Sequence, residues 1–232
     1  MKLSTFNFQL STRSGFTLIE LMVTLAIFTI MTGIVLANYP DFNTKISRDV
    51  LVQNVALAIR EAQVHGISIR SQDIGTLATA YGVYINDTQS YPLFSDNDSD
   101  NIYDSGDLIV PGNNNLIQGG KNKILLVCGN YHYTNNSGPA VRTDCEDAAK
   151  HPENLATANT SKELNIVFHR PNPEAIITGT LKEGINQCDS SGDVLPDLDG
   201  FCRYNNAAIF IGDGLGTYKK VIIWNTGQIA TE

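Results

Sequence analysis

The densest group of side chains that could carry chemistry is an acidic run between residues 96 and 107. Oxygens fall at places 1, 3, 5, 7, 9 and 12 of this run, from Asp96, Asp98, Asp100, the carbonyl of Ile102, Asp104 and Asp107. Calcium loops of the EF-hand or dockerin type order their ligands in this way. The run departs from that pattern at place 6, which is Asn101 instead of glycine, and at place 12, which is aspartate instead of glutamate. The spacing is compatible with a structural calcium ion, and a solvated turn is the alternative interpretation; no cofactor is otherwise required.

A second chemical feature is a lone acid, Glu20, inside the apolar run 16–37. A run of this length can cross the hydrocarbon core of a bilayer as a helix. The preceding leader carries Lys2 and Arg13 and no acid, so it should stay cytoplasmic and place the rest of the chain outside. Because a carboxylate is costly in lipid, Glu20 is a candidate functional residue. Its natural partner is an amino group created at Phe16, because removal of a leader that ends at Gly15 leaves the helix on the protein.

The segment Gly15-Phe-Thr-Leu-Ile-Glu20 resembles the class III signal of type IV pilins and type II secretion pseudopilins. The resemblance covers about the first fifth of the chain. It implies that a prepilin peptidase cuts between Gly15 and Phe16 and methylates the amino group of Phe16. It also implies that Glu20 sets the register of an adjacent subunit in a helical fibre. A plain single-pass anchor with a chance glutamate is the alternative, and it explains neither Gly15 nor the place of Glu20.

Four cysteines lie beyond the anchor and would face the exterior, where an even number favours disulfides. They are Cys128, Cys145, Cys188 and Cys202. The simplest of the three connectivities pairs neighbours, Cys128 with Cys145 and Cys188 with Cys202. Zinc is an alternative, because histidines follow the first two cysteines at positions 132 and 151, but this spacing fits no standard finger.

Composition restricts the class of protein. The chain has 232 residues and a formal net charge of −8; cleavage after Gly15 would remove only two basic residues and leave −10. This balance argues against a general nucleic-acid binder, which needs dense lysine and arginine. The closing segment 221–229 resembles the last hairpin of related minor pilins, but Gly227 is followed by Gln228, Ile229 and Ala230 instead of the arginines that DNA-binding members carry there. No nucleophile motif occurs either, so we expect no enzyme.

The elements that must position these residues follow from periodicity. We expect a leader at 1–15, a membrane or fibre-core helix at 16–39, an amphipathic continuation at 40–66, and a β-rich head at 67–232. Pro40 predicts a kink or break. Apolar residues recur on the continuation at helical spacing and should pack onto a sheet: Ile46, Val50, Val55, Ala58, Ile59 and Ala62.

The head should be built from short strands. Candidate strands are 82–85, 91–94, 123–128, 164–169, 175–181, 207–211 and 220–225. The glycines at 212, 214 and 216 predict a hairpin turn, and residues 131–161 read as a loop-like insertion. One long helix followed by strands predicts an α+β fold with antiparallel pairing. The helix from 55 to 66, the hairpin segments 81–84 and 91–96, and the closing segment 221–229 also resemble H-type pseudopilins and related minor pilins.

The leading hypothesis is a minor pilin or pseudopilin of a type IV pilus or a type II secretion pseudopilus. Its partners would be a prepilin peptidase, other pilins and, before assembly, the inner membrane, with the C-terminal domain outside. A pilus-associated binding module for DNA uptake or adhesion is the alternative hypothesis. The sequence alone does not separate a pilus subunit from a pseudopilus subunit.

Overall fold

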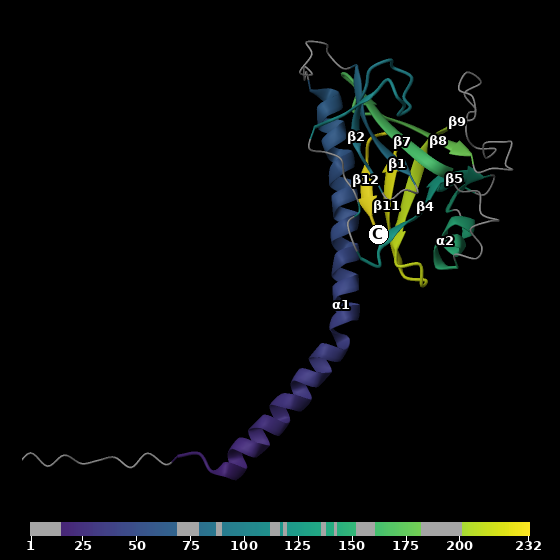
Figure 1. Cartoon of the computed structure of the whole chain (residues 1–232). Helices are drawn as coiled ribbons and strands as arrows, with labels where there is room; N and C mark the ends of the chain where they lie inside the picture. The colour runs from purple at the N-terminus through teal and green to yellow at the C-terminus, as the bar shows by residue number, and fades with distance from the viewer. Residues whose placement is uncertain are drawn as a thin grey trace, which may run out of the picture. The chain divides into compact units, whose positions relative to one another are not determined.

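The computed structural model describes residues 15–68, 79–86, 90–111, 117, 120–135, 138–141, 143–151, 161–181 and 201–232 (Figure 1). The chain divides into two compact units, residues 1–43 and 44–232. The first unit contains the beginning of helix α1 (Leu18–Ile67), and the second contains its remainder and all strands among the described residues. The helix continues across Pro40, so of the kink or break expected there, the break does not occur.

In its described residues, the second unit combines antiparallel strands with the remainder of α1 and a short helix, α2. Its elements are β1 (Ala80–Asn86), β2 (Leu93–Asp96), β3 (Leu108–Ile109), β4 (Lys123–Gly129), β5 (His132–Asn135), β6 (Gly138–Val141), α2 (Thr143–Lys150), β7 (Ser161–His169), β8 (Ala175–Leu181), β9 (Phe201–Tyr204), β10 (Asn206–Gly212), β11 (Tyr218–Trp224) and β12 (Ile229–Thr231). This is the α+β fold that the sequence predicts: a long N-terminal helix, apolar in its first part, packed on antiparallel strands.

Ten of these strands form one sheet in the order β12-β11-β10-β4-β7-β1-β2-β3, with β8 pairing β7 and β9 pairing β8. A separate hairpin is made by β5 and β6. All seven candidate strands coincide at least partly with observed strands, although β2 begins two residues later than expected. The glycine-rich segment does join β10 and β11 as a hairpin turn. The interval 131–161, read as a loop, instead contains β5, β6 and α2.

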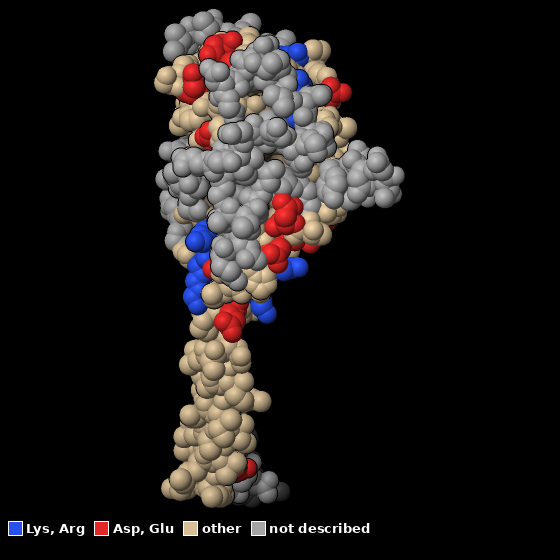
Figure 2. All heavy atoms as spheres, turned by 90° about the vertical axis from the view of Figure 1, so that its right-hand side faces the viewer, with Lys and Arg blue, Asp and Glu red and all other residues tan. Residues whose placement is uncertain are grey.

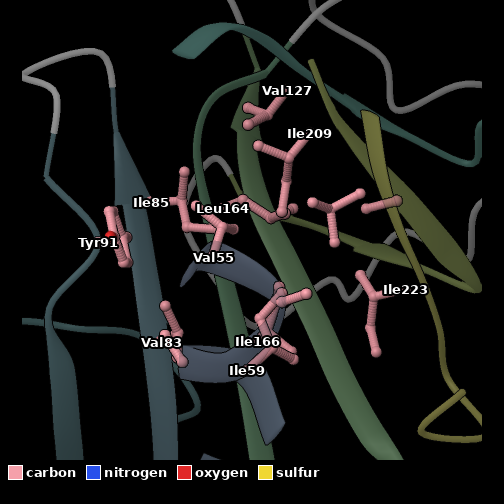
Figure 3. Close-up of a cluster of buried hydrophobic side chains, with 14 of the residues drawn as sticks. Val55, Ile59, Val83, Ile85, Tyr91, Val127, Leu164, Ile166, Ile209 and Ile223 are labelled. Atoms are coloured by element: carbon pink, nitrogen blue, oxygen red, sulfur yellow. The ribbon is translucent and has the colours of Figure 1, made fainter. Parts of the chain in front are cut away.

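The main core lies between one face of the sheet and α1 (Figure 3). Val55 and Ile59 of the helix are fully buried against Ile85, Leu164 and Ile166 of the sheet. Strand side chains alternate between the two faces, so every second residue of β1 and β7 can reach the helix. Burial of these side chains from water is the principal force that holds α1 to the sheet.

The apolar stripe expected on the helix is only partly correct. Val55, Ile59 and Ala62 are buried, whereas Ile46 and Val50 are 45% and 51% exposed. These two residues lie near the start of the second unit, on the side of the helix that faces away from the sheet. Their apolar character is therefore not explained by the core of the isolated chain.

Candidate functional site

Glu20 caps the helix that contains it. Helix α1 begins at Leu18, and the hydroxyl of Thr17 accepts the backbone N–H of Glu20 at 3.3 Å. The Glu20 carboxylate accepts the backbone N–H and the hydroxyl of Thr17, each at 3.4 Å. This reciprocal arrangement is a capping box, which satisfies two N–H groups that a helix start would otherwise leave unpaired. The Thr-x-x-Glu pattern could have revealed it, and our sequence reasoning did not use it.

The other polar side chains of the apolar run bond to their own helix. The hydroxyls of Thr24, Thr29 and Thr32 each donate to a backbone carbonyl three or four residues earlier, at 2.8–2.9 Å. A threonine that is satisfied in this way costs less in an apolar medium. Helix α1 is long and apolar enough to cross a membrane by length and composition. Residues 15–43 are all exposed in the isolated chain, Phe16 by 80%.

The acidic run forms a compact loop between β2 and β3. Asp96, at its start, accepts the backbone N–H groups of Ser99 at 2.6 Å and Asn101 at 3.1 Å. At the other end, Asp107 accepts the N–H groups of Asn97 at 3.0 Å and Asp104 at 3.3 Å. Asn101 has a φ of 66°, the left-handed conformation that glycine usually provides at place 6 of a calcium loop.

This folding brings the predicted ligands together. Carboxylate oxygens of Asp96, Asp98 and Asp107 lie within 4.8 Å of one another, and so do those of Asp98, Asp100 and Asp104. Asp98 belongs to both groups, so the five acids surround one small region. The sixth expected ligand residue, Ile102, is 8% exposed and donates its N–H to Asp100.

The loop is held on the outer face of the sheet, away from α1. Asn165 of β7 accepts the N–H of Tyr103 at 3.1 Å, and the Thr178 hydroxyl of β8 donates to the carbonyl of Asn101 at 3.1 Å. The ring of Tyr103 packs on those of Tyr84 and Phe94, with centroids 4.9 and 5.2 Å apart. The loop is thus a packed part of the head.

The negative charge of the loop is not balanced by a positively charged side chain of the described residues. Burial raises the pKa of Asp96 and of Asp100, and it raises the pKa of Asp107 to about 6, helped by the charges of Asp96 and Asp98. Among the described residues, no lysine, arginine or histidine forms an ion pair with the five carboxylates. Buried carboxylates without a cation favour their protonated form. Hard oxygen ligands at these distances could hold a divalent cation, which would reverse that preference.

The cysteines link the sheet to α2. A disulfide joins Cys128 of β4 to Cys145 of α2, and both residues are fully buried. Cys202 is also disulfide-bonded, while Cys188 lies outside the described residues. None of the described cysteines is free, which removes the thiolates that the zinc alternative requires.

A buried polar cluster supports the same contact between α2 and the sheet. Lys220 of β11 donates to the Tyr131 hydroxyl at 2.7 Å and to Glu146 of α2 at 3.0 Å, and it pairs with Glu232 at 3.2 Å. Burial lowers the pKa of Lys220, but these three hydrogen bonds outweigh it and raise the pKa overall. Lys220 is therefore a structural cation that links β11 to α2.

Comparison with known proteins identifies one segment. Residues 10–36 match the family described as the prokaryotic N-terminal methylation motif, the N-terminus of type IV pilins and pseudopilins. No curated protein and no solved structure matches the chain. The matched segment contains Gly15, Phe16 and Glu20, and it leaves the subfamily of the β-rich head unresolved.

Proposed function

We propose that this chain, which carries a type IV pilin-like methylation motif, is a minor structural subunit of a type IV pilus or a type II secretion pseudopilus. A prepilin peptidase cuts it between Gly15 and Phe16 and methylates the new amino group of Phe16. Before assembly, α1 anchors the chain in the inner membrane with the second unit outside. One observation carries the proposal: the methylation motif at 10–36 coincides with an exposed apolar helix that contains one acid, Glu20.

Glu20 has a role in this proposal that goes beyond the capping box. Its carboxylate is exposed in the isolated chain and can exchange the weak 3.4 Å contacts with Thr17 for a stronger partner. A charge-assisted hydrogen bond to an amine is shorter and about twice as strong as a neutral one. The amine of Phe16 on a neighbouring subunit is such a partner, and pairing would neutralise both charges within the apolar fibre core.

Processing is tested in cells that contain a prepilin peptidase. Gly15→Leu should leave the full-length chain, whereas the wild type should lose residues 1–15 and gain the mass of one methyl group. Ser14→Ala is the matched control and should be processed normally. Intact mass spectrometry of the membrane fraction provides the measurement. A wild-type chain that still begins at Met1 beside an active peptidase would disprove the proposal.

The role of Glu20 in assembly is tested with two variants that break the same capping box. Glu20→Ala removes the carboxylate, and Thr17→Ala removes its helix-capping partner but keeps the charge. If Glu20 neutralises a neighbouring amine, Glu20→Ala should be processed but absent from sheared fibres, while Thr17→Ala should be incorporated. Equal loss of both variants from the fibres would show that only capping matters.

We also propose that the acidic loop 96–107 holds a structural calcium ion. The support is the ligand spacing, the left-handed Asn101, and the burial of Asp96 and Asp107 without a protein cation in the described part of the chain. The ion would fix the loop against β7 and β8, and with it the outer face of the head. Its role would be stability of the subunit outside the cell, where calcium is abundant.

Thermal unfolding with calcium and with chelator tests the ion. Binding to the folded state alone should stabilise the protein by about 2.7 kcal/mol when free calcium is one hundred times the dissociation constant. Asp98→Ala should abolish this gain, because Asp98 contributes to both groups of three carboxylates. Asp49→Asn, an exposed acid of α1, is the control and should keep the gain. Identical unfolding curves with and without calcium would reject the site.

A further inference from the structure

The turn between β10 and β11 presents an exposed apolar side chain. Leu215 is 82% exposed, more than any other large apolar residue of the second unit among those described. The turn has a fixed shape, because Asp213 accepts the N–H of Leu215 at 2.9 Å and the hydroxyl of Thr217 at 2.6 Å. Gly214 and Gly216 on either side have φ values of 73° and 91°. The turn therefore keeps the apolar side chain of Leu215 in water, which is unfavourable. The fold of the head does not require this exposure.

Lysines surround this turn at the end of the second unit where α1 enters. Lys121 and Lys123 flank Asn122, whose side chain donates to the carbonyl of Thr44 at 2.8 Å, beside Lys45. Lys123 also pairs across the sheet with Gly212, at the start of the turn. Lys219, at its end, reaches Asp49 of α1 at 2.9 Å. We call Lys45, Lys121, Lys123, Lys219 and Leu215 the basal surface.

The basal surface has a positive surplus although the chain is acidic overall. Asp49 is paired with Lys219, and Asp213 is occupied within the turn and lies in the field of the buried Arg48. Lys45, Lys121 and Lys123 are exposed and form no ion pair in the described part of the chain. Figure 2 shows blue side chains, with a few red ones among them, at this end of the β-rich unit. Because the chain has a net charge of −8, a local excess of positive charge on this surface indicates an anionic partner.

We propose that the basal surface docks on an anionic lipid bilayer, with Leu215 inserted among the headgroups. The occupant follows from chain connectivity, since only six residues separate Thr44, where the second unit begins, from the apolar run 16–37 that would span the membrane. Lysines with one apolar side chain between them are the composition of interfacial anchors, because ammonium groups attract anionic headgroups while the apolar group leaves water. The inference rests on the proposed membrane anchoring of the subunit. It adds that the head itself is held on the membrane before assembly.

The test uses the full chain in lipid nanodiscs that contain brominated lipid, with and without an anionic phospholipid. A tryptophan introduced as Leu215→Trp reports contact with the bilayer through quenching, measured relative to the wild type, which already contains Trp224. Asn172→Trp is the control, because Asn172 lines a pocket with Asn225 and Thr226, at the opposite end of β11. In anionic discs, we expect Leu215→Trp to be quenched about twofold more than the control, and less at high salt.

Charge variants complete the test. Lys121→Gln with Lys123→Gln should reduce the quenching of Leu215→Trp to that of the control, because anionic headgroups would lose two of their partners. Equal quenching at positions 215 and 172 would overturn the inference. So would equal quenching of Leu215→Trp in nanodiscs with and without anionic phospholipid. A lysine-dependent gel shift with duplex DNA and no lipid effect would also overturn it. A chain that fails to enter nanodiscs at all would refute the membrane anchor, whereas entry without contact at position 215 would refute only the docking of the head.

Discussion

At the scale of residues, one side chain can serve folding and function at different stages. Glu20 and Thr17 close the start of α1 by mutual hydrogen bonds in the isolated chain. The same carboxylate is the lone acid of a segment that we propose to be buried in lipid and later in a fibre. In the proposed assembly, the weak contacts with Thr17 would satisfy the helix start until a neighbouring amine replaces them.

Asp107 should make the stability of the head depend on pH. Its pKa in the fold is raised from 3.8 to about 6, chiefly by burial, so the folded state favours the protonated carboxyl. Without a divalent cation, the free energy of unfolding should therefore fall as pH rises from about 4 to 6 and stay low above that. Each pKa unit corresponds to about 1.4 kcal/mol. Asp107→Asn should flatten this part of the curve in denaturant titrations performed with chelator.

Calcium should oppose this pH dependence in the wild type, because the ion stabilises the ionised form of Asp107. The Asn variant has no charge at this position and should gain less from calcium. A wild-type stability that rises between pH 4 and 6 in chelator would contradict the assignment of the raised pKa to Asp107.

At the scale of elements, the two sides of α1 within the second unit have different tasks. The buried side carries Val55 and Ile59, which are fully covered by the sheet, and the opposite side carries Leu57 and Val64, each 62% exposed. A helix that only served the head would not need apolar residues on the second side. This distribution is consistent with a helix that meets other molecules along its length.

The two sides should respond differently to truncation. Ile59→Ala should lower the free energy of unfolding of the head by about 2–5 kcal/mol, because it leaves a cavity in the core. Leu57→Ala is the matched control on the exposed side and should change it by no more than about 0.5 kcal/mol. Denaturant unfolding monitored by the fluorescence of Trp224 would measure both. Similar losses would show that the exposed side is packed in the isolated chain.

The contact between α2 and the sheet depends on a covalent link. The disulfide between Cys128 and Cys145 closes a loop with a sequence separation of 17 residues. Replacing both cysteines by alanine should destabilise the head by about 3 kcal/mol, since loop closure restricts the unfolded chain. The Lys220 cluster would remain, so we expect the variant to fold with α2 in place. An unchanged midpoint in denaturant would argue that the disulfide contributes nothing.

At the scale of the whole molecule, processing and folding should be separable. Gly15, Phe16 and Glu20 lie in the first unit, and the core of the head lies in the second. Ile59→Ala should therefore lower the free energy of unfolding of the head, but the chain should still be cut after Gly15. Conversely, Gly15→Leu should block cleavage and leave the unfolding midpoint of the head unchanged. Intact mass and denaturant unfolding of the same two preparations would check this; loss of cleavage in Ile59→Ala would show that the peptidase needs a folded head.

Several features could be predicted from local pattern alone. The motif around Gly15 and Glu20 depends on contiguous residues, and the apolar run needs only length and composition to form a membrane-length helix. Most strands carry an alternating pattern, and the α+β class follows from their order after one helix. Missed elements have weaker signals. Helix α2 has eight residues, although Thr143-x-x-Glu146 is a capping-box pattern, and β3 has two residues.

The long apolar helix, the methylation motif and the spacing of the acids in the loop 96–107 can be read from the sequence, because each depends on residues close together in the chain. The partners that these residues meet follow from the folded structure. The sheet brings Asn165 and Thr178 under the acidic loop, Lys220 to Glu146, and residues near 45, 121 and 215 to one end of the head. Such contacts join segments far apart in sequence, and their register is set by strand pairing and burial rather than by local preference.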